Sequence, residues 1–207
     1  MLTQLIFDLD DTLIKSDHIF NEFLEARRHW SALDHLMSGL SGRPYYEIRS
    51  SIERSHGDEV AKEFVSSFLD WYDTEGWMSH QPFDGVEEAL NEISAHSGRD
   101  IVIVTNKRTF AAERVLESLL PTIGFSVQGV DSVNATGKRD NIQRAKAEFP
   151  SPKHVYVGDT LQDFHDAKSA GILFAGARWC ESPVEFTTIA FDSIRNLVSW
   201  WKTDEIE

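Results

Sequence analysis

Short apolar runs alternate with helical stretches over most of the chain, and this alternation constrains the fold more than any other feature. The runs that are typical of buried strands lie at residues 5–7, 101–104, 125–130, 154–157 and 172–174. Stretches with helical spacing of apolar residues lie between them, at 85–96, 109–119, 138–148 and 162–169. Strands separated by helices in this way imply right-handed crossovers and a parallel sheet covered on both faces. The sequence therefore predicts an α/β fold with a Rossmann-like parallel sheet.

Residues 15–83 depart from this alternation, because we find no strand pattern in them. Helices are predicted at 17–37, with Asp17 as its cap, at 45–55, and from Asp58 to Tyr72. Gly39, Gly42 and Pro44 break the first two apart, and 76–82 is predicted to be a loop. We therefore predict a core domain of residues 1–14 and 84–207, an all-helical insertion of residues 15–83, hinges at 13–17 and 81–85, and a frayed tail at 200–207.

The composition is that of an ordinary water-soluble protein with an acidic surface. The 34 Asp and Glu residues outnumber the 20 Lys and Arg residues, which gives a formal charge of -14 and disfavours a nucleic-acid partner. No apolar run approaches the roughly 20 residues needed to cross a bilayer, and no signal peptide is recognisable. Cys180 is the one cysteine, so no internal disulfide can form. We expect a cytoplasmic monomer or homodimer without a membrane partner.

Two neighbouring acids, Asp8 and Asp10, follow the first predicted strand directly. Parallel strands of α/β proteins end at the crevice where ligands bind, and two acids so close together repel each other unless a cation or a shared proton compensates. A turn or a helix cap is the alternative for a single Asp. A calcium loop of the EF-hand type is excluded, because Leu13 stands where that loop requires Gly.

Polar or acidic residues also follow two other predicted strands. Thr105 and Asn106 follow the second predicted strand, and Asp159 and Asp163 follow the strand at 154–157. Since the carboxyl ends of parallel strands share one edge, these side chains are predicted to converge with Asp8 and Asp10. Carboxylates without His or Cys favour a hard cation such as Mg²⁺, and Lys138 supplies a positive charge. A carboxylate nucleophile, a metal, a hydroxyl and an ammonium together indicate phosphoryl transfer through an aspartyl-phosphate.

The order of these motifs resembles that of the haloacid dehalogenase-like hydrolases. The first motif of that family is matched by Asp8-Leu9-Asp10-Asp11-Thr12, the second by Thr105, the third by Lys138, and the fourth by Gly158-Asp159-Thr160-Leu161-Gln162-Asp163. Each match is weak alone, whereas four in order at strand ends are specific. The resemblance covers essentially the whole chain outside residues 15–83.

The resemblance implies a role for each matched residue. Asp8 would be the nucleophile, and Asp10 the general acid that protonates the leaving alcohol and then activates water. Because relatives that dehalogenate lack this second acid, Asp10 points to hydrolysis of a phosphate ester. The phosphate would be bound by Thr105, Asn106 and Lys138.

The same resemblance implies the metal ligands of the site. Asp8, the backbone carbonyl of Asp10, and Asp159 would bind Mg²⁺, with Asp163 binding it directly or through water.

The chain also departs from the family pattern at several positions. Asp11 stands where many relatives have Gly, and we predict a turn or capping role for it. Arg139 follows Lys138 where Pro is common, so Arg139 or Lys107 are alternatives for part of the phosphate binding. Asp166 is predicted to be an acid in the first turn of a helix, with an indirect role at the site as the alternative. The Gly137-Lys138 pair does not make a nucleotide-binding loop, because Ser132 replaces the required first Gly.

The helical insertion is similar in position to the cap of phosphoglycolate phosphatase-like relatives, which closes over the site and contacts the substrate. We predict that Arg43 contacts a second anionic or polar group of the substrate, while the nearby aromatic residues have packing in the cap core as their alternative. The function implied is a magnesium-dependent phosphatase acting on a small phosphorylated metabolite. The alternatives are a phosphomutase with the same fold, and a catalytically idle protein that binds a partner through its cap.

Overall fold

A six-stranded sheet forms the centre of the molecule. The computed structural model describes residues 3–37, 43–98, 100–131, 138–180, 185–187 and 189–203. The strands are β1 (Gln4–Phe7), β4 (Ile101–Val104), β5 (Phe125–Gln128), β6 (His154–Gly158), β7 (Leu173–Ala177) and β8 (Ala190–Phe191). They pair in the order β5-β4-β1-β6-β7-β8, and every pair is parallel. The predicted α/β fold with a Rossmann-like sheet is therefore confirmed.

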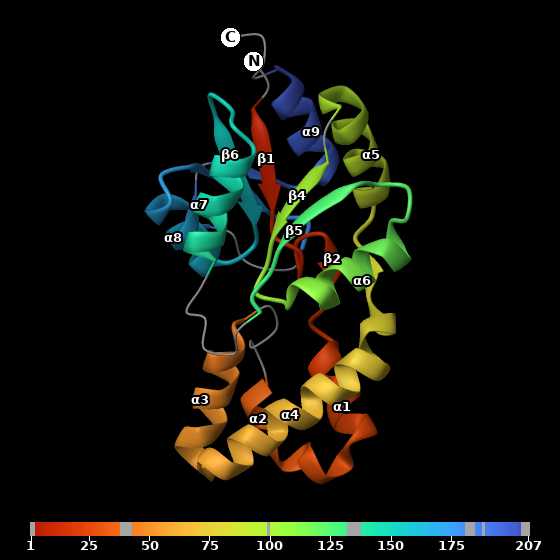
Figure 1. Cartoon of the computed structure of the whole chain (residues 1–207), viewed down its shortest axis with the longest axis vertical. Coiled ribbons are helices and arrows are strands. Elements are labelled where there is room, and N and C mark those ends of the chain that lie inside the picture. Colours follow the sequence, from red (N-terminus) through yellow and green to blue (C-terminus); the bar gives the residue numbers. More distant parts are fainter. Residues whose placement is uncertain are drawn as a thin grey trace.

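Alternate residues of the strands face two apolar cores, one on each side of the sheet. Leu5 and Phe7 of β1 pack in the core covered by α5 (Val86–Ser97), α6 (Thr109–Leu119) and α9 (Ile194–Thr203). Ile6 packs in the opposite core, covered by α7 (Arg139–Glu148) and α8 (Leu161–Ser169). Figure 1 shows these two helix layers on either side of the sheet. Burial on both faces explains why the strands are continuous apolar runs.

The insertion after β1 is helical and has a third apolar core of its own. Its elements are α1 (Ile19–Ala26), the 3-10 helix η1 (Arg28–Leu33), α2 (Asp34–Met37), α3 (Tyr45–His56), α4 (Asp58–Thr74) and the 3-10 helix η2 (Gly76–Ser79). In Figure 1 it lies below the sheet, at the end where the strands finish. The separate core supports the predicted division at residues 15–83, and those bounds stay a prediction.

The prediction of one helix over 17–37 was wrong. Arg27 leaves helical geometry at φ -125° and ψ 63°, and a 3-10 helix follows. A 3-10 helix places residues i and i+3 on the same face, so Trp30 and Leu33 can both be buried in the core of the insertion. The predicted cap was also wrong, because His18 and not Asp17 precedes α1. Gly39 and Gly42 lie outside the described residues.

Two connections join the insertion to the sheet, and they pair with each other. Strand β2 (Ile14–Lys15) runs antiparallel to β3 (Gln81–Pro82), so the prediction that 15–83 contains no strand was wrong at its two ends. Both predicted hinge segments take part in this ribbon. A sequence pattern could not reveal it, because each strand is only two residues long and the paired residues lie 68 positions (Ile14 and Pro82) and 66 positions (Lys15 and Gln81) apart.

The C-terminal segment is ordered further than predicted. Helix α9 extends to Thr203, and the indole N–H of Trp201 donates to the carbonyl of Thr3 at 2.7 Å. The fully buried Leu197 and Trp201 anchor this helix beside α5. The predicted frayed tail was therefore wrong for residues 200–203, and residues 204–207 lie outside the described part.

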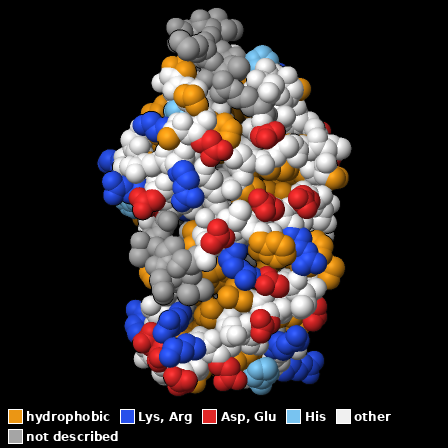
Figure 2. All heavy atoms as spheres, viewed as in Figure 1, with side chains coloured by type: hydrophobic (Ala, Val, Ile, Leu, Met, Phe, Trp, Pro, Cys, Tyr) orange, Lys and Arg blue, Asp and Glu red, His pale blue; other side chains and the backbone are white. Residues whose placement is uncertain are grey.

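The described surface carries both charged and apolar side chains. Figure 2 shows charged side chains of both signs spread over one face, with apolar side chains near the level where core and insertion meet. Among the described helices, none has the length and apolar character required to span a membrane.

Candidate active site

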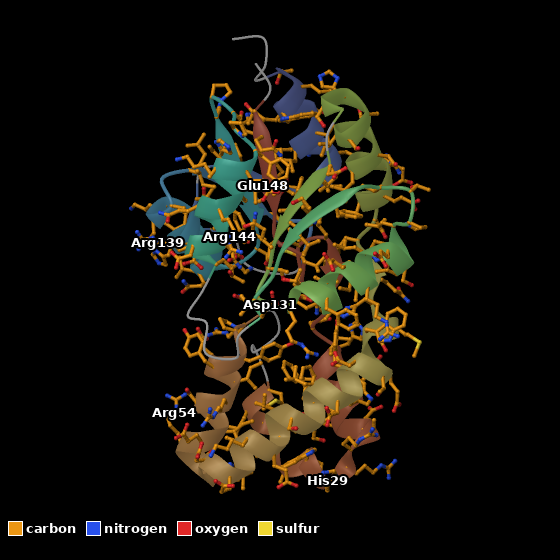
Figure 3. The ribbon with its side chains drawn as sticks, viewed as in Figure 1. His29, Arg54, Asp131, Arg139, Arg144 and Glu148 are labelled. Atoms are coloured by element: carbon orange, nitrogen blue, oxygen red, sulfur yellow. The ribbon has the colours of Figure 1, made fainter. Side chains whose placement is uncertain are left out.

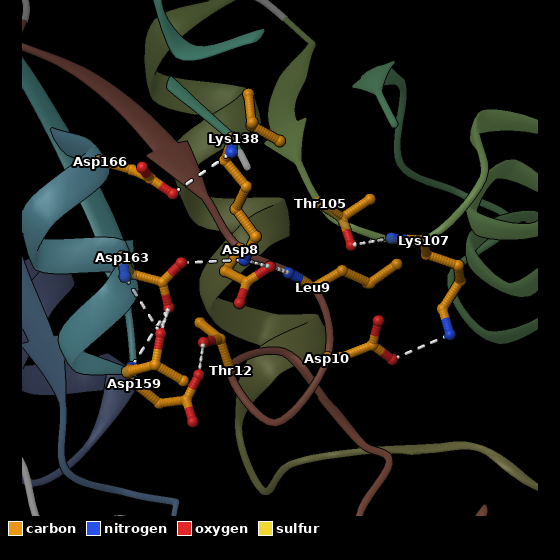
Figure 4. Close-up of polar contacts among 12 residues, drawn as sticks. Asp8, Leu9, Asp10, Thr12, Thr105, Lys107, Lys138, Asp159, Asp163 and Asp166 are labelled. Atoms are coloured by element: carbon orange, nitrogen blue, oxygen red, sulfur yellow. Dashed lines mark hydrogen bonds and ion pairs between the residues drawn. The ribbon is translucent and has the colours of Figure 1, made fainter. Parts of the chain in front are cut away.

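The chain folds back on itself directly after β1, and this turn separates the two leading acids. Leu9 O accepts hydrogen bonds from the backbone N–H groups of Leu13 at 2.9 Å and Ile14 at 3.1 Å. Asp11 adopts a positive φ of 55°, and its Oδ1 accepts from Ser16 N at 2.7 Å. Asp11 thus has the turn role predicted for it. As a result Asp8 and Asp10 point to different sides of the loop (Figure 4).

Asp8 belongs to a buried cluster of three carboxylates with Asp159 and Asp163. One oxygen of each lies within 4.8 Å of one oxygen of the others, and the three residues are 2%, 4% and 1% exposed. Burial, with the charges of the other two acids adding to it, raises the pKa of Asp8 well above its usual range. Burial and then the charge of Asp163 raise the pKa of Asp159 to about 7. The cluster is therefore unfavourable as three bare anions.

Lys138 supplies the compensating charge. Its Nζ lies 2.7 Å from Asp8 Oδ1 and 2.9 Å from Asp163 Oδ1, and its side chain is 3% exposed (Figure 4). Burial alone would lower its pKa, but the two carboxylates outweigh burial and raise it, so the ammonium stays protonated. Lys138 immediately precedes α7, and Gly137 before it lies outside the described residues.

Asp166 fixes the backbone of Lys138. Its Oδ2 accepts from Lys138 N at 3.2 Å, and its Oδ1 accepts from the amide of Gln162 at 3.1 Å. The prediction of a first-turn acid was wrong, because α8 begins at Leu161 and Asp166 is its sixth residue. The side chain instead links two helices on the same face of the sheet.

A capping box orients Asp163. The Thr160 hydroxyl accepts from Asp163 N at 3.1 Å and donates to Asp163 Oδ2 at 2.6 Å. This leaves Asp163 Oδ1 for Lys138. Gly158 makes the arrangement possible, since a Cβ there would lie 2.8 Å from Asp163 Oδ2. The capping role of Thr160 was missed, although its spacing from an acid three residues later is a recognised helix-start pattern. Thr12 was also missed, and its hydroxyl donates to Asp159 Oδ1 at 3.0 Å.

Asp10 is held in a separate, basic environment. Lys107 Nζ lies 2.9 Å from Asp10 Oδ1, and the Ser16 hydroxyl donates to the same oxygen at 2.6 Å. Burial would raise the pKa of Asp10, but the Lys107 ammonium and the hydrogen bonds outweigh it and lower the pKa. Lys107 Nζ also lies 4.6 Å from the centre of the Tyr72 ring in α4. Asp10 is thus ionised in this arrangement.

Thr105, directly after β4, positions the backbone of Lys107. Lys107 N donates to Thr105 Oγ1 at 3.1 Å, and both residues are buried, as is Asn106 between them. Lys107 and Arg139 were the two alternatives for sharing phosphate binding with Lys138. Lys107 lies at the site, whereas Arg139 is exposed on the outside of α7 (Figure 3).

His80 ties Asp10 to the insertion, and this residue was missed. Its Nδ1 lies 3.0 Å from the carbonyl of Lys15, which can only accept, so Nδ1 carries the proton. Nε2 must then accept from the Tyr72 hydroxyl at 2.7 Å. Nδ1 also lies 3.4 Å from the hydroxyl of Ser16, which donates to Asp10. Burial lowers the pKa of His80 to about 4, which keeps the ring neutral. No spacing in the sequence signals this long-range contact.

A cavity opens beside Asp10, between the sheet edge and the insertion. It encloses about 430 Å³, part of it open to solvent, and Asn106, Lys107 and Arg43 contribute to its lining. Arg43 Nη1 donates to Glu47 Oε2 at 3.0 Å. Of the predicted site residues, Asp10, Asn106 and Arg43 therefore line one cavity.

The raised pKa of Asp159 gives a testable stability effect. In the unfolded chain this carboxyl titrates near 4, whereas in the folded protein it titrates at about 7, so the folded state binds the additional proton between these values. In EDTA we therefore expect the free energy of unfolding to fall by on the order of 1 kcal/mol from about pH 6 to about pH 8. Denaturant melts measure this slope, and the Asp159→Asn variant should have a shallower one. An equal slope in both proteins would contradict the assignment.

Comparisons with known proteins agree with this architecture. A family model described as haloacid dehalogenase-like hydrolase matches residues 5–177. The Tyrosine-protein kinase PtkA of Mycobacterium tuberculosis is 27% identical over 190 residues, which cover 88% of this chain and 64% of that protein. The chain thus spans less than two thirds of the length of this curated relative.

Solved structures resemble the chain over nearly its full length. A predicted phosphatase from Clostridium acetobutylicum has a TM-score of 0.80 at 19% identity, covering 98% of this chain and 99% of that one. A predicted phosphoglycolate phosphatase from Haemophilus somnus has a TM-score of 0.71 at 18% identity, covering 96% and 97%. The predicted arrangement of a parallel sheet with a helical cap inserted after the first strand is therefore confirmed.

Proposed function

Because the chain belongs to the haloacid dehalogenase-like hydrolase family, as its motifs indicated, we propose that it is a magnesium-dependent phosphatase acting on a small phosphate monoester. The observation that carries this proposal is the buried cluster of Asp8, Asp159 and Asp163 with the Lys138 ammonium against it. A cluster of carboxylates suits a hard cation, and an adjacent ammonium suits a phosphate dianion.

The residues present fit a magnesium ion. Three buried carboxylates within 4.8 Å of one another form an all-oxygen donor set, and burial raises the pKa values of Asp8 and Asp159 above the ordinary value, so the site favours a further positive charge. We assign the metal ligands to Asp8, Asp159, Asp163 and the backbone carbonyl of Asp10. When bound, Mg²⁺ would neutralise charge that develops on the transferring phosphoryl group.

We assign the covalent chemistry to Asp8 and the proton transfers to Asp10. Asp8 Oδ1 accepts from both Leu9 N and Lys138, so we assign the attack to Oδ2. An Asp8–phosphorus bond forms, the bond from phosphorus to the ester oxygen breaks, and a protonated Asp10 gives its proton to the departing alkoxide. Asp10, now a carboxylate, takes a proton from water as that water attacks phosphorus, which releases phosphate and restores Asp8.

The ion pair with Lys107 affects these two proton transfers differently. As a carboxylate, Asp10 is ready to act as the base for water attack. Its acid role requires a proton, and the negative charge of an arriving phosphate would raise its pKa toward the protonated form. Lys107 therefore favours the hydrolytic half of the reaction.

We assign phosphate binding to Thr105, Asn106 and Lys138. Each is buried at the end of β4 or the start of α7, close to the carboxyl end of β1. The Lys138 ammonium contacts both Asp8 and Asp163. It would also contact an oxygen of a phosphoryl group carried by Asp8. We keep Arg43 as a predicted contact for a polar group of the substrate.

Phosphate release from p-nitrophenyl phosphate tests the proposed function. We expect turnover in Mg²⁺ and none in excess EDTA. Metal binding has its own readout: Mg²⁺ should raise the Tm of the native protein by several degrees, because the ion binds only the folded state. The Asp159→Asn variant should show a smaller rise. Turnover that persists in EDTA, or equal shifts in both proteins, would contradict the metal assignment.

Phosphoryl transfer to tyrosine is a second candidate, favoured by the similarity to PtkA. Incubation with ATP labelled at the γ-phosphate distinguishes the two, because a kinase would transfer the label to protein tyrosine, whereas a phosphatase specific for monoesters would not. A phosphomutase would instead require a bisphosphate activator. A catalytically idle protein that binds a partner would do none of these.

A further inference from the structure

Aliphatic and aromatic side chains of the insertion form one wall of the cavity beside Asp10, and polar or charged side chains form the rest. The aliphatic and aromatic side chains come from α1, α3 and α4 and comprise Ile19, Phe20, Tyr45, Ile48, Phe68 and Tyr72. Phe20 and Phe68 stack on each other with ring centres 4.8 Å apart and planes 26° apart.

Lys107 and Arg43, which line this cavity, each have an acidic partner. Lys107 pairs with Asp10 at 2.9 Å, and Arg43 pairs with Glu47 at 3.0 Å. An incoming carboxylate would have to compete with Glu47 for Arg43 and with Asp10 for Lys107, and Asp10 would repel it. Electrostatics therefore do not select a small acidic leaving group here.

We propose that the preferred substrates are phosphate monoesters whose alcohol carries an uncharged ring, an aryl or arylalkyl group. This inference rests on the proposed function, since it requires the phosphoryl group to lie between Asp8 and Lys138. The ester oxygen then lies next to Asp10, and the rest of the alcohol extends into the cavity that Asp10 lines. Rings bury a large apolar area and pack in defined geometries against other rings, so the Phe20 and Phe68 pair suits such a group.

The test compares 2-phenylethyl phosphate, ethyl phosphate and phosphoglycolate, whose alcohols are all aliphatic. We expect kcat/KM for 2-phenylethyl phosphate to exceed that for ethyl phosphate by at least about tenfold, because the ring is removed from water. A ratio near one, or a tenfold preference for phosphoglycolate over 2-phenylethyl phosphate, would overturn the proposal.

A matched pair of variants locates the preference. Phe68→Leu changes the cavity wall and should reduce the 2-phenylethyl to ethyl ratio by about threefold or more. Phe64 lies one turn earlier in α4, in the core of the insertion against Phe23 and Trp30. The Phe64→Leu variant should therefore preserve the ratio. A ratio within one protein does not depend on the folded fraction. Equal changes in both variants would contradict a role for the wall.

A binding measurement separates this inference from the proposed function. Calorimetry with the Asp8→Asn variant should give a Kd for 2-phenylethyl phosphate at least about tenfold below that for ethyl phosphate. If the wild type released no phosphate from any ester while this difference in Kd persisted, the proposed function would fail and the cavity assignment would stand. If the wild type released phosphate but neither kcat/KM nor Kd differed between the two esters, the proposed function would stand and the cavity assignment would fail.

Discussion

The Asp8→Asn variant is expected to release phosphate at least about a thousandfold more slowly than the wild type, because an amide cannot form the aspartyl-phosphate. Asn has the same shape, and its oxygen can accept from Leu9 N and Lys138 as Asp8 Oδ1 does. The fold should therefore survive. Since burial and two neighbouring acids raise the pKa of Asp8, removing its charge should leave the Tm in EDTA unchanged or higher. Steady-state kinetics and thermal melts measure both effects.

Asp11→Asn is the matched control. Asp11 lies in the same turn, and Asn keeps the oxygen that accepts from Ser16 N and tolerates the positive φ of 55°. We expect kcat within about twofold of the wild type, as is usual for a substitution that keeps its contacts. Turnover in Asp8→Asn close to that of the wild type, or an equal loss in Asp11→Asn, would contradict the assignment of the nucleophile.

The ends of the strands could be predicted because they depend only on the residues of each strand. A parallel strand buried on both faces is a continuous apolar run, and its carboxyl end must lie at one edge of the sheet. Asp8 and Asp159 were therefore predicted to lie at the same edge, and the pairing of β1 with β6 brings them together. Lys138 was identified differently, by its positive charge and its match to the third family motif, because it precedes a helix and does not follow a strand.

The environment of Asp10 could not be predicted, because it depends on contacts between distant segments. Lys107 and Ser16 contact Asp10 directly, and His80 lies beside Ser16, so this environment depends on how the insertion sits on the sheet. The division of residues 17–37 has a similar cause. Burial of Trp30 and Leu33 in the core of the insertion overrides a helical pattern that reads as continuous.

The Asp10→Asn variant should lower kcat/KM for ethyl phosphate by about 10²- to 10⁴-fold, the range expected for loss of a general acid. Since kcat/KM reports the steps through phosphorylation of Asp8, the loss should depend on the leaving group. An alkoxide requires protonation as it departs, whereas p-nitrophenolate does not. We therefore expect a much smaller decrease in kcat/KM for p-nitrophenyl phosphate. Parallel measurements on the two esters give this ratio.

The Asp10→Asn variant also loses the buried ion pair with Lys107. Lys107 would lose its carboxylate partner, so we expect a lower Tm. The ratio between two esters does not depend on the folded fraction, and Ser16→Ala supplies a comparison that removes one hydrogen bond but keeps the carboxylate. Ser16→Ala should lower kcat/KM for ethyl phosphate by less than about tenfold. If Asp10→Asn lowered kcat/KM equally for both esters, Asp10 would be positioning Lys107 and Ser16 and not transferring a proton to the leaving group.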